Sequence, residues 1–152
     1  MYLVLTALLA LNISKDILDA FVIVNQSIAA SSETTARKMG TLYSDFELAR
    51  SIDPEKVDNY WMRSQVARRH ATDIITFIDS VKTTLISKTE NINRAVADTL
   101  SMRLIAKKDD YDTPTNLLIG EREDGSGGLA NMLKNKIEEY QINMRSLLNE
   151  QD

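Results

Sequence analysis

The chain has 152 residues, 43% of them apolar and 26% charged, which is an ordinary composition for a packed domain. Its formal charge of −4 is spread without a block of like charge, so the electrostatic footprint of a nucleic-acid-binding protein is missing. The sequence contains no cysteine, which excludes disulfides and thiolate metal sites, and only 5 glycines and 2 prolines, too few for the many turns of an all-β fold.

The first segment, residues 1–11, is uncharged and mostly apolar. As a helix it would span about 16 Å, whereas a bilayer core needs about 20 apolar residues. Three interpretations fit: the core of a signal peptide, a buried core helix, or a transmembrane helix whose upstream part is missing. No basic residue precedes the run and residues 7–10 make a poor cleavage site, which argues against the signal peptide.

After this run, apolar residues recur at the helical spacings of four, four, three and four, at Ile13, Ile17, Phe21, Val24 and Ile28. The pattern weakens over residues 31–35 and resumes in register at Met39. The simplest interpretation is one long helix that runs from the membrane to about Ser51. Residues 31–35 and Gly40 are the places where it could bend or break.

A second helix is predicted to begin at Asp53-Pro54-Glu55, because Asp caps free N–H groups and Pro suits a first helical turn. Its apolar face ends near Lys88. A third, shorter apolar pattern runs from Ile92 to Ile105. The residues leave open whether this pattern continues the second helix or follows a bend at 89–91.

The longest break in the helical pattern is residues 107–128, which contain a short apolar run, Leu117–Ile119, that could dock on the other helices or pair as a strand. The last helix is predicted to begin near Leu129. Three or four long helices with short connections predict an all-α, up-down helical bundle. The first helix is too long for a compact bundle and is expected to project from it.

No residue pattern indicates catalysis, a cofactor or a metal site. The glycines from Gly120 to Gly128 lack the Gly-Lys-Ser/Thr ending of a phosphate loop. His70, the single histidine, is expected on a solvated helix face. The acids of residues 109–112 lack the spacing and glycine of a calcium loop. The sequence therefore predicts a protein that is not an enzyme.

One polar stripe is expected on the first helix, since four small or polar residues are each four positions apart: Tyr2, Thr6, Ala10 and Ser14. Small residues at this spacing let membrane helices approach closely, and hydroxyls can bond across the contact. The stripe is predicted to contact the membrane helices of a partner.

The hydrophobic run followed by Asn12-Ile13-Ser14-Lys15-Asp16 and Phe21 resembles the signature of the GldM/PorM family of Bacteroidetes over roughly the first 25 residues. The resemblance implies a single-pass inner-membrane protein with its bulk in the periplasm. Residues 1–24 are then a transmembrane helix, its upstream part missing, and a membrane-exit segment. The coupling residues of that segment are Asn12, Lys15, Asp16 and Phe21. Residues 25–152 are a periplasmic helical bundle whose C-terminal continuation, with further β-rich domains, is missing.

The resemblance further implies a shaft subunit of the proton-powered motor that drives type IX protein secretion and gliding motility. Its implied partners are a second copy of the chain, a GldL/PorL-type membrane ring and periplasmic ring components of the GldK/GldN type. Two other classes fit the residues. One is a membrane-anchored sensory or receptor-like ectodomain, which a ligand pocket between helices would favour. The other is a cytosolic helical adaptor. Extraction of the protein from cell membranes by salt would favour the adaptor, whereas a need for detergent would favour a membrane-anchored protein.

Overall fold

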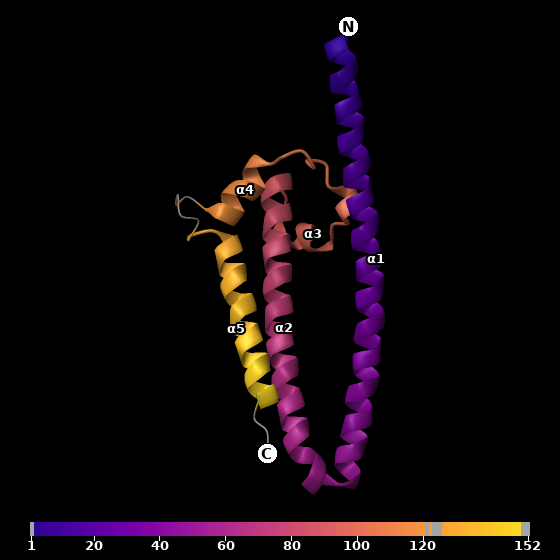
Figure 1. Ribbon diagram of the computed structural model, residues 1–152, viewed down its shortest axis with the longest axis vertical. Helices are drawn as coiled ribbons and strands as arrows, with labels where there is room; N and C mark the ends of the chain where they lie inside the picture. The colour runs from indigo at the N-terminus through magenta and orange to yellow at the C-terminus, as the bar shows by residue number, and fades with distance from the viewer. Residues whose placement is uncertain (1, 121, 123–125, 150–152) are drawn as a thin grey trace. The chain divides into compact units, whose positions relative to one another are not determined.

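The computed structural model divides the chain into two compact units, Met1–Asp53 and Pro54–Asp152. It describes the backbone of residues 2–120, 122 and 126–149, and their side chains apart from those of residues 2–16, 18 and 149. Within these residues the secondary structure is helical and none is in a strand (Figure 1), so the predicted all-α class is confirmed. The predicted division into residues 1–24 and 25–152 is not tested by this split and stays a prediction.

The first unit is a single helix, α1 (Tyr2–Ile52), of 51 residues. At 1.5 Å per residue it is about 75 Å long. The predicted continuous helix is confirmed, and it ends one residue beyond the expected Ser51. Neither residues 31–35 nor Gly40 interrupts it.

The predicted transmembrane helix is not found as such. Within the part of the chain that the structure describes, no helix holds a stretch long and apolar enough to cross a membrane. The physical reason is visible in the sequence, where the apolar run of residues 1–11 gives way to Asn12, Ser14, Lys15 and Asp16 well before the roughly 20 residues that a bilayer core requires.

The second unit begins with α2 (Pro54–Glu90), whose start confirms the helix predicted from Asp53-Pro54-Glu55. The helix ends at a left-handed residue, Asn91, with φ of 56°. The Ile92 N–H then donates to the Ser87 carbonyl oxygen at 3.0 Å, which is the closing bond of a Schellman motif. The chain therefore bends at this point, and the third apolar pattern does not continue α2.

That third pattern forms two short elements, α3 (Arg94–Thr99) and the 3₁₀ turn η1 (Met102–Leu104). The side chain of Asn93 caps α3 by accepting a hydrogen bond from the Ala95 N–H at 2.9 Å. Leu100 and Ser101 have extended backbones, which separate the two elements. The apolar pattern from Ile92 to Ile105 is thus divided between two short elements and does not form one helix.

A further helix, α4 (Asp112–Ile119), lies inside the predicted break. It contains the apolar run Leu117–Ile119, which is helical and belongs to an element in contact with α2 and α5. The sequence left open whether this run docks on the other helices or pairs as a strand. The prediction of docking is confirmed, and that of strand pairing is wrong. Gly120 ends the helix with φ of 82°, and its N–H donates to the Asn116 carbonyl oxygen at 2.8 Å.

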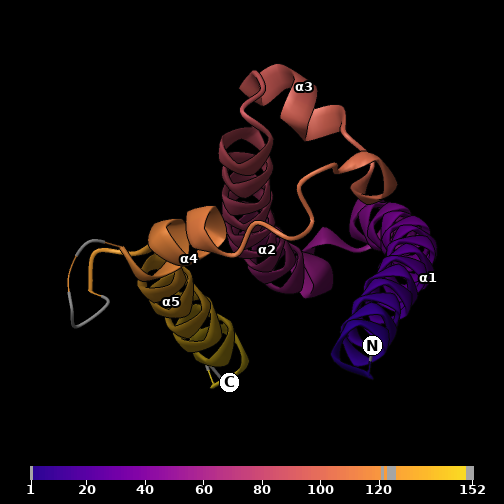
Figure 2. The same cartoon turned by 90° about the horizontal axis from the view of Figure 1, so that it is seen from above.

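The last helix, α5 (Leu129–Asn149), begins where it was predicted. It lies beside α2 and runs antiparallel to it, as both views show (Figures 1 and 2). The second unit is therefore an antiparallel pair of long helices with the short α3 and α4 packed on α2. It contains two long helices, so the full up-down bundle expected from the sequence is not established.

The most buried part of the second unit is the C-terminal half of α2, where α3 packs. Val81 and Ile86 are buried there, and Ala97 of α3 is only 1% exposed. A small side chain at residue 97 lets the two helix backbones approach closely. Among the described residues, the buried apolar side chains are those of Val81, Ile86 and Ala97, so the core of the second unit is small.

Hydrogen bonds complete this contact. The buried hydroxyl of Thr83 donates to Asp98 Oδ1 at 2.9 Å, so its burial leaves no unpaired group. Arg94 reaches from α3 to α2, where its guanidinium donates to Ser80 Oγ at 2.8 Å and to Thr84 Oγ1 at 3.0 Å. These bonds set the position of α3 along α2.

Candidate functional site

The predicted partner stripe lies on α1. The backbones of Tyr2, Thr6, Ala10 and Ser14 are helical, so residues four positions apart share one face. Their side chains fall outside the described residues. The helical register that the stripe requires is therefore present, and its role in partner contact stays a prediction.

The predicted membrane-exit segment also lies within α1. The side chains of Asn12, Lys15 and Asp16 fall outside the described residues. The side chain of Phe21 is described, and it is 67% exposed. An aromatic ring this exposed has little packing within its own unit.

Phe21 is one of many apolar side chains that α1 exposes. These residues form two groups separated by residues 29–38, a stretch without a large apolar side chain: Ile17, Phe21, Ile23, Val24 and Ile28 in the first group, and Met39, Leu42, Leu48 and Ile52 in the second. A single helix cannot bury its own apolar residues, so neither group is buried within the first unit.

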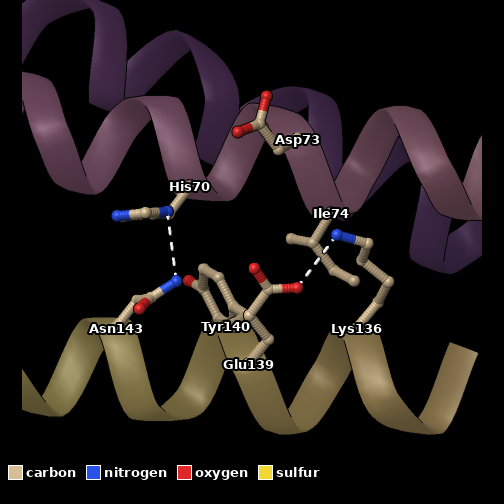
Figure 3. A pocket seen from close by; sticks show the side chains of 7 residues that line it. All are labelled: His70, Asp73, Ile74, Lys136, Glu139, Tyr140 and Asn143. Atoms are coloured by element: carbon tan, nitrogen blue, oxygen red, sulfur yellow. Dashed lines mark hydrogen bonds and ion pairs between the residues drawn. The ribbon is translucent and has the colours of Figure 1, made fainter.

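A small polar pocket lies in the second unit between α2 and α5 (Figure 3). Its cavity volume is about 50 Å³, and it is lined by His70, Asp73, Ile74, Lys136, Glu139, Tyr140 and Asn143. Such a volume holds one or two water molecules, whereas metabolite pockets measure about 300–1,000 Å³. The pocket thus does not favour the receptor-like interpretation, which needs a ligand site between helices.

The single histidine is half-buried in this pocket, and not on the fully solvated face that was expected. Its Nδ1 lies 3.5 Å from the amide nitrogen of Asn143, at the outer limit of a hydrogen bond that the amide would donate to an unprotonated ring nitrogen. The sequence could not indicate this pair because the two residues are 73 positions apart. The partner of His70 in this pair is an amide, which is not a nucleophile that the imidazole could activate.

The charges beside His70 form their own pair. Lys136 Nζ lies 2.9 Å from Glu139 Oε2, one turn along α5. The Lys136 hydrogen bond, the charge of Lys136 and a smaller attraction to His70 hold the pKa of Glu139 below its ordinary value of 4.5. A carboxyl group with a lowered pKa carries no proton to donate near neutral pH and is a weak base, so it suits neither general-acid nor general-base catalysis.

One of the acidic residues between 109 and 112 stabilises a helix terminus. Asp110 Oδ1 accepts a hydrogen bond from the Thr113 N–H at 3.0 Å, which satisfies a free donor in the first turn of α4. Among the described residues, no group of three or more His, Cys, Asp or Glu side chains is placed to hold a metal ion.

The glycines around α4 are also structural. The element before Gly120 is the helix α4, and not the strand that a phosphate loop requires. A Cβ added to Gly120 would lie 2.8 Å from the backbone of Gly127, and one added to Gly128 would overlap the carbonyl oxygen of Leu118. The end of α4 at Gly120 and the residues before α5, Gly127 and Gly128, are therefore in backbone contact. A side chain at Gly120 or Gly128 would prevent this contact.

Most of the chain matches one known protein family. The model of the family described as GldM N-terminal domain matches residues 16–152, which is most of the chain. The chain belongs to the GldM family. No curated protein matches it significantly.

The GldM match confirms the resemblance that the residues before about 25 carried. It also covers α2 to α5, whose apolar patterns were compatible with the family without identifying it. As a GldM-family protein, the chain is a component of type IX secretion and gliding motility, associated with the membrane of the cell envelope and with other Gld/Por components.

Proposed function

We propose that this GldM-family chain is a non-enzymatic shaft subunit of a proton-powered motor for type IX secretion and gliding. In this role it carries motion from a membrane ring of the GldL/PorL type to periplasmic components of the GldK/GldN type. It is anchored in the inner membrane as a single-pass homodimer, with its second unit in the periplasm.

The observation that carries the proposal is the continuity of α1. A shaft must transmit torque, and an uninterrupted helix of 51 residues does so where a loop would let its two ends turn independently. No proline occurs between residues 1 and 53, so the hydrogen-bond ladder of α1 has no built-in gap. The expectation that the chain is not an enzyme belongs to the same proposal, and the His70 pocket described above supports it.

Torsional continuity can be tested at Val22. Val22→Pro removes one helical hydrogen bond and costs about 3 kcal/mol locally, while each flanking region keeps its own helical turns. We expect secretion and gliding to fail in this variant while protein level and co-purification of the membrane ring persist. The matched control is Val22→Ala, which shortens the side chain but keeps the backbone N–H, and it should secrete normally.

Normal secretion by Val22→Pro would favour a passive anchor over a shaft, provided that dipolar distances between spin labels placed on either side of residue 22 confirm a kink. Equal loss of secretion in both variants would place the defect in the side chain, not in helix continuity.

The membrane contact is tested at the stripe formed by Tyr2, Thr6, Ala10 and Ser14. Ala10→Leu adds bulk on the stripe and should weaken co-purification with the ring protein, since helix backbones can no longer approach closely. Leu8→Ile, a substitution of equal volume off the stripe, should leave co-purification unchanged. Equal losses for the two variants would remove the case for the stripe.

A further inference from the structure

The middle of α1 differs from its two ends in composition. Residues 29–38 contain no large apolar side chain, and they hold Ser31, Ser32, Thr34 and Thr35. Serine and threonine favour helices less than alanine does, and Gly40, which follows, is the least favourable residue after proline. The stretch from residue 31 to residue 41, which we call the joint segment, therefore combines four Ser and Thr residues in its first half with the only glycine of α1 in its second.

The side chains in and around the joint segment are not buried within the first unit. Every side chain from residue 23 to residue 42 is exposed. The space beside Gly40 is open, because a Cβ added there would have no atom within 4 Å. In a protein helix most of the stability comes from tertiary packing of an apolar face, and the large apolar side chain of the joint segment, Met39, is exposed.

Hydroxyl groups modify the backbone hydrogen bonds in and around this segment. Five hydroxyls each donate to the carbonyl oxygen four residues earlier, at 3.0–3.3 Å: those of Ser27, Thr34, Thr35, Thr41 and Ser44. A carbonyl shared between a hydroxyl and the helical N–H binds the N–H less tightly, and such back-bonding bends helices. Three of the five donors lie within the joint segment.

We infer that the joint segment is a bending joint built into α1. It keeps the helical ladder, so it still resists twisting, but it bends more easily than the segments on either side. A membrane-proximal part and a distal part of the helix can then point in different directions while they turn together. The inference concerns the helix itself and goes beyond the proposed shaft, because the joint is testable whether or not the chain transmits motion.

The first test is amide hydrogen exchange of the full-length chain in its membrane or detergent complex. Amides of residues 31–41 should exchange faster than those of residues 42–50. Gly40→Ala should slow exchange in the joint segment by about five-fold, because alanine stabilises a helix interior relative to glycine and its Cβ meets nothing here. Ser27→Ala, which also removes a back-bonding hydroxyl but lies outside the segment, should leave that exchange unchanged.

The second test measures bending directly. The chain has no cysteine, so Asp19→Cys and Glu47→Cys allow specific spin labelling of two exposed positions on either side of the joint. In a straight helix the labelled residues are about 42 Å apart. In samples diluted with unlabelled chain, we expect a broad distribution with shorter distances, which Gly40→Ala should narrow towards the straight value. A single narrow peak at about 42 Å without that substitution, or uniform exchange along α1, would overturn the inference.

Discussion

The absence of a Cβ at Gly128 allows two backbone segments of the second unit to lie in direct contact. A side chain there would overlap the Leu118 carbonyl oxygen and the backbone of Ile119. The end of α4 and the start of α5 are therefore in backbone contact, and the short helix can lie against both long ones.

The first prediction follows from this contact. Gly128→Ala must push α4 away from α5, and we expect it to destabilise the second unit by about 2 kcal/mol or more. The measurement is urea unfolding followed by circular dichroism. The matched control is Gly40→Ala, where a Cβ meets nothing within 4 Å, and which should be neutral or stabilising by up to about 1 kcal/mol. Similar losses in both variants would contradict the contact.

At the scale of elements, each helix boundary of the second unit has an identifiable local cause. Asn91 ends α2 in a left-handed conformation, Asn93 caps α3, and Asp110 accepts from the first turn of α4. These features depend only on residues that are close in the sequence. They divide the helical pattern that follows α2 into separate short elements.

The start of α4 should depend on pH. The hydrogen bond from the Thr113 N–H, followed by the one from its hydroxyl, holds the pKa of Asp110 below its ordinary value of 3.8. A lowered folded-state pKa means that the carboxylate stabilises the folded form above pH 3.8, and that this contribution is lost as the pH falls through the folded-state pKa.

We therefore expect the Asp110 carboxyl carbon to titrate below pH 3.8 in NMR spectra. Asp110→Asn should lower the stability of α4 at neutral pH, and the difference from the unmodified chain should vanish in strong acid. Asp109→Asn makes the same change in charge one residue earlier and serves as the control. A carboxyl titration at or above the ordinary value would refute the capping role.

At the scale of the whole molecule, the chain has a first unit that is a single long helix and a second unit of packed helices with its own small core. Many large apolar side chains of α1 are exposed, whereas in the second unit α2 contacts α3, α4 and α5. The two units should therefore respond differently to removal of the apolar N-terminus.

A fragment that begins at Asn25 should be soluble and mainly helical, because the later helices bury their apolar faces without lipid. Circular dichroism of the fragment should show the two minima of an α-helix and a cooperative thermal transition from the second unit. A spectrum dominated by β structure, or a fragment that needs detergent to stay in solution, would contradict this prediction.

The sequence by itself determined the helical class, the length of α1, the start of α2 at Pro54 and the start of α5 near Leu129. These features depend on apolar periodicity and on proline and glycine, which act within a few residues along the chain. The family, too, was recognisable from the residues before about 25, and the match over residues 16–152 confirmed it.

Only the tertiary structure decided the rest. The docking of α4, the burial of Thr83 against Asp98 and the pairing of His70 with Asn143 join residues that the chain sequence separates, by 15 positions in one pair and 73 in the other. Local propensity carries no information on such contacts, because their energy comes from burial and hydrogen bonds that exist only once the helices have packed.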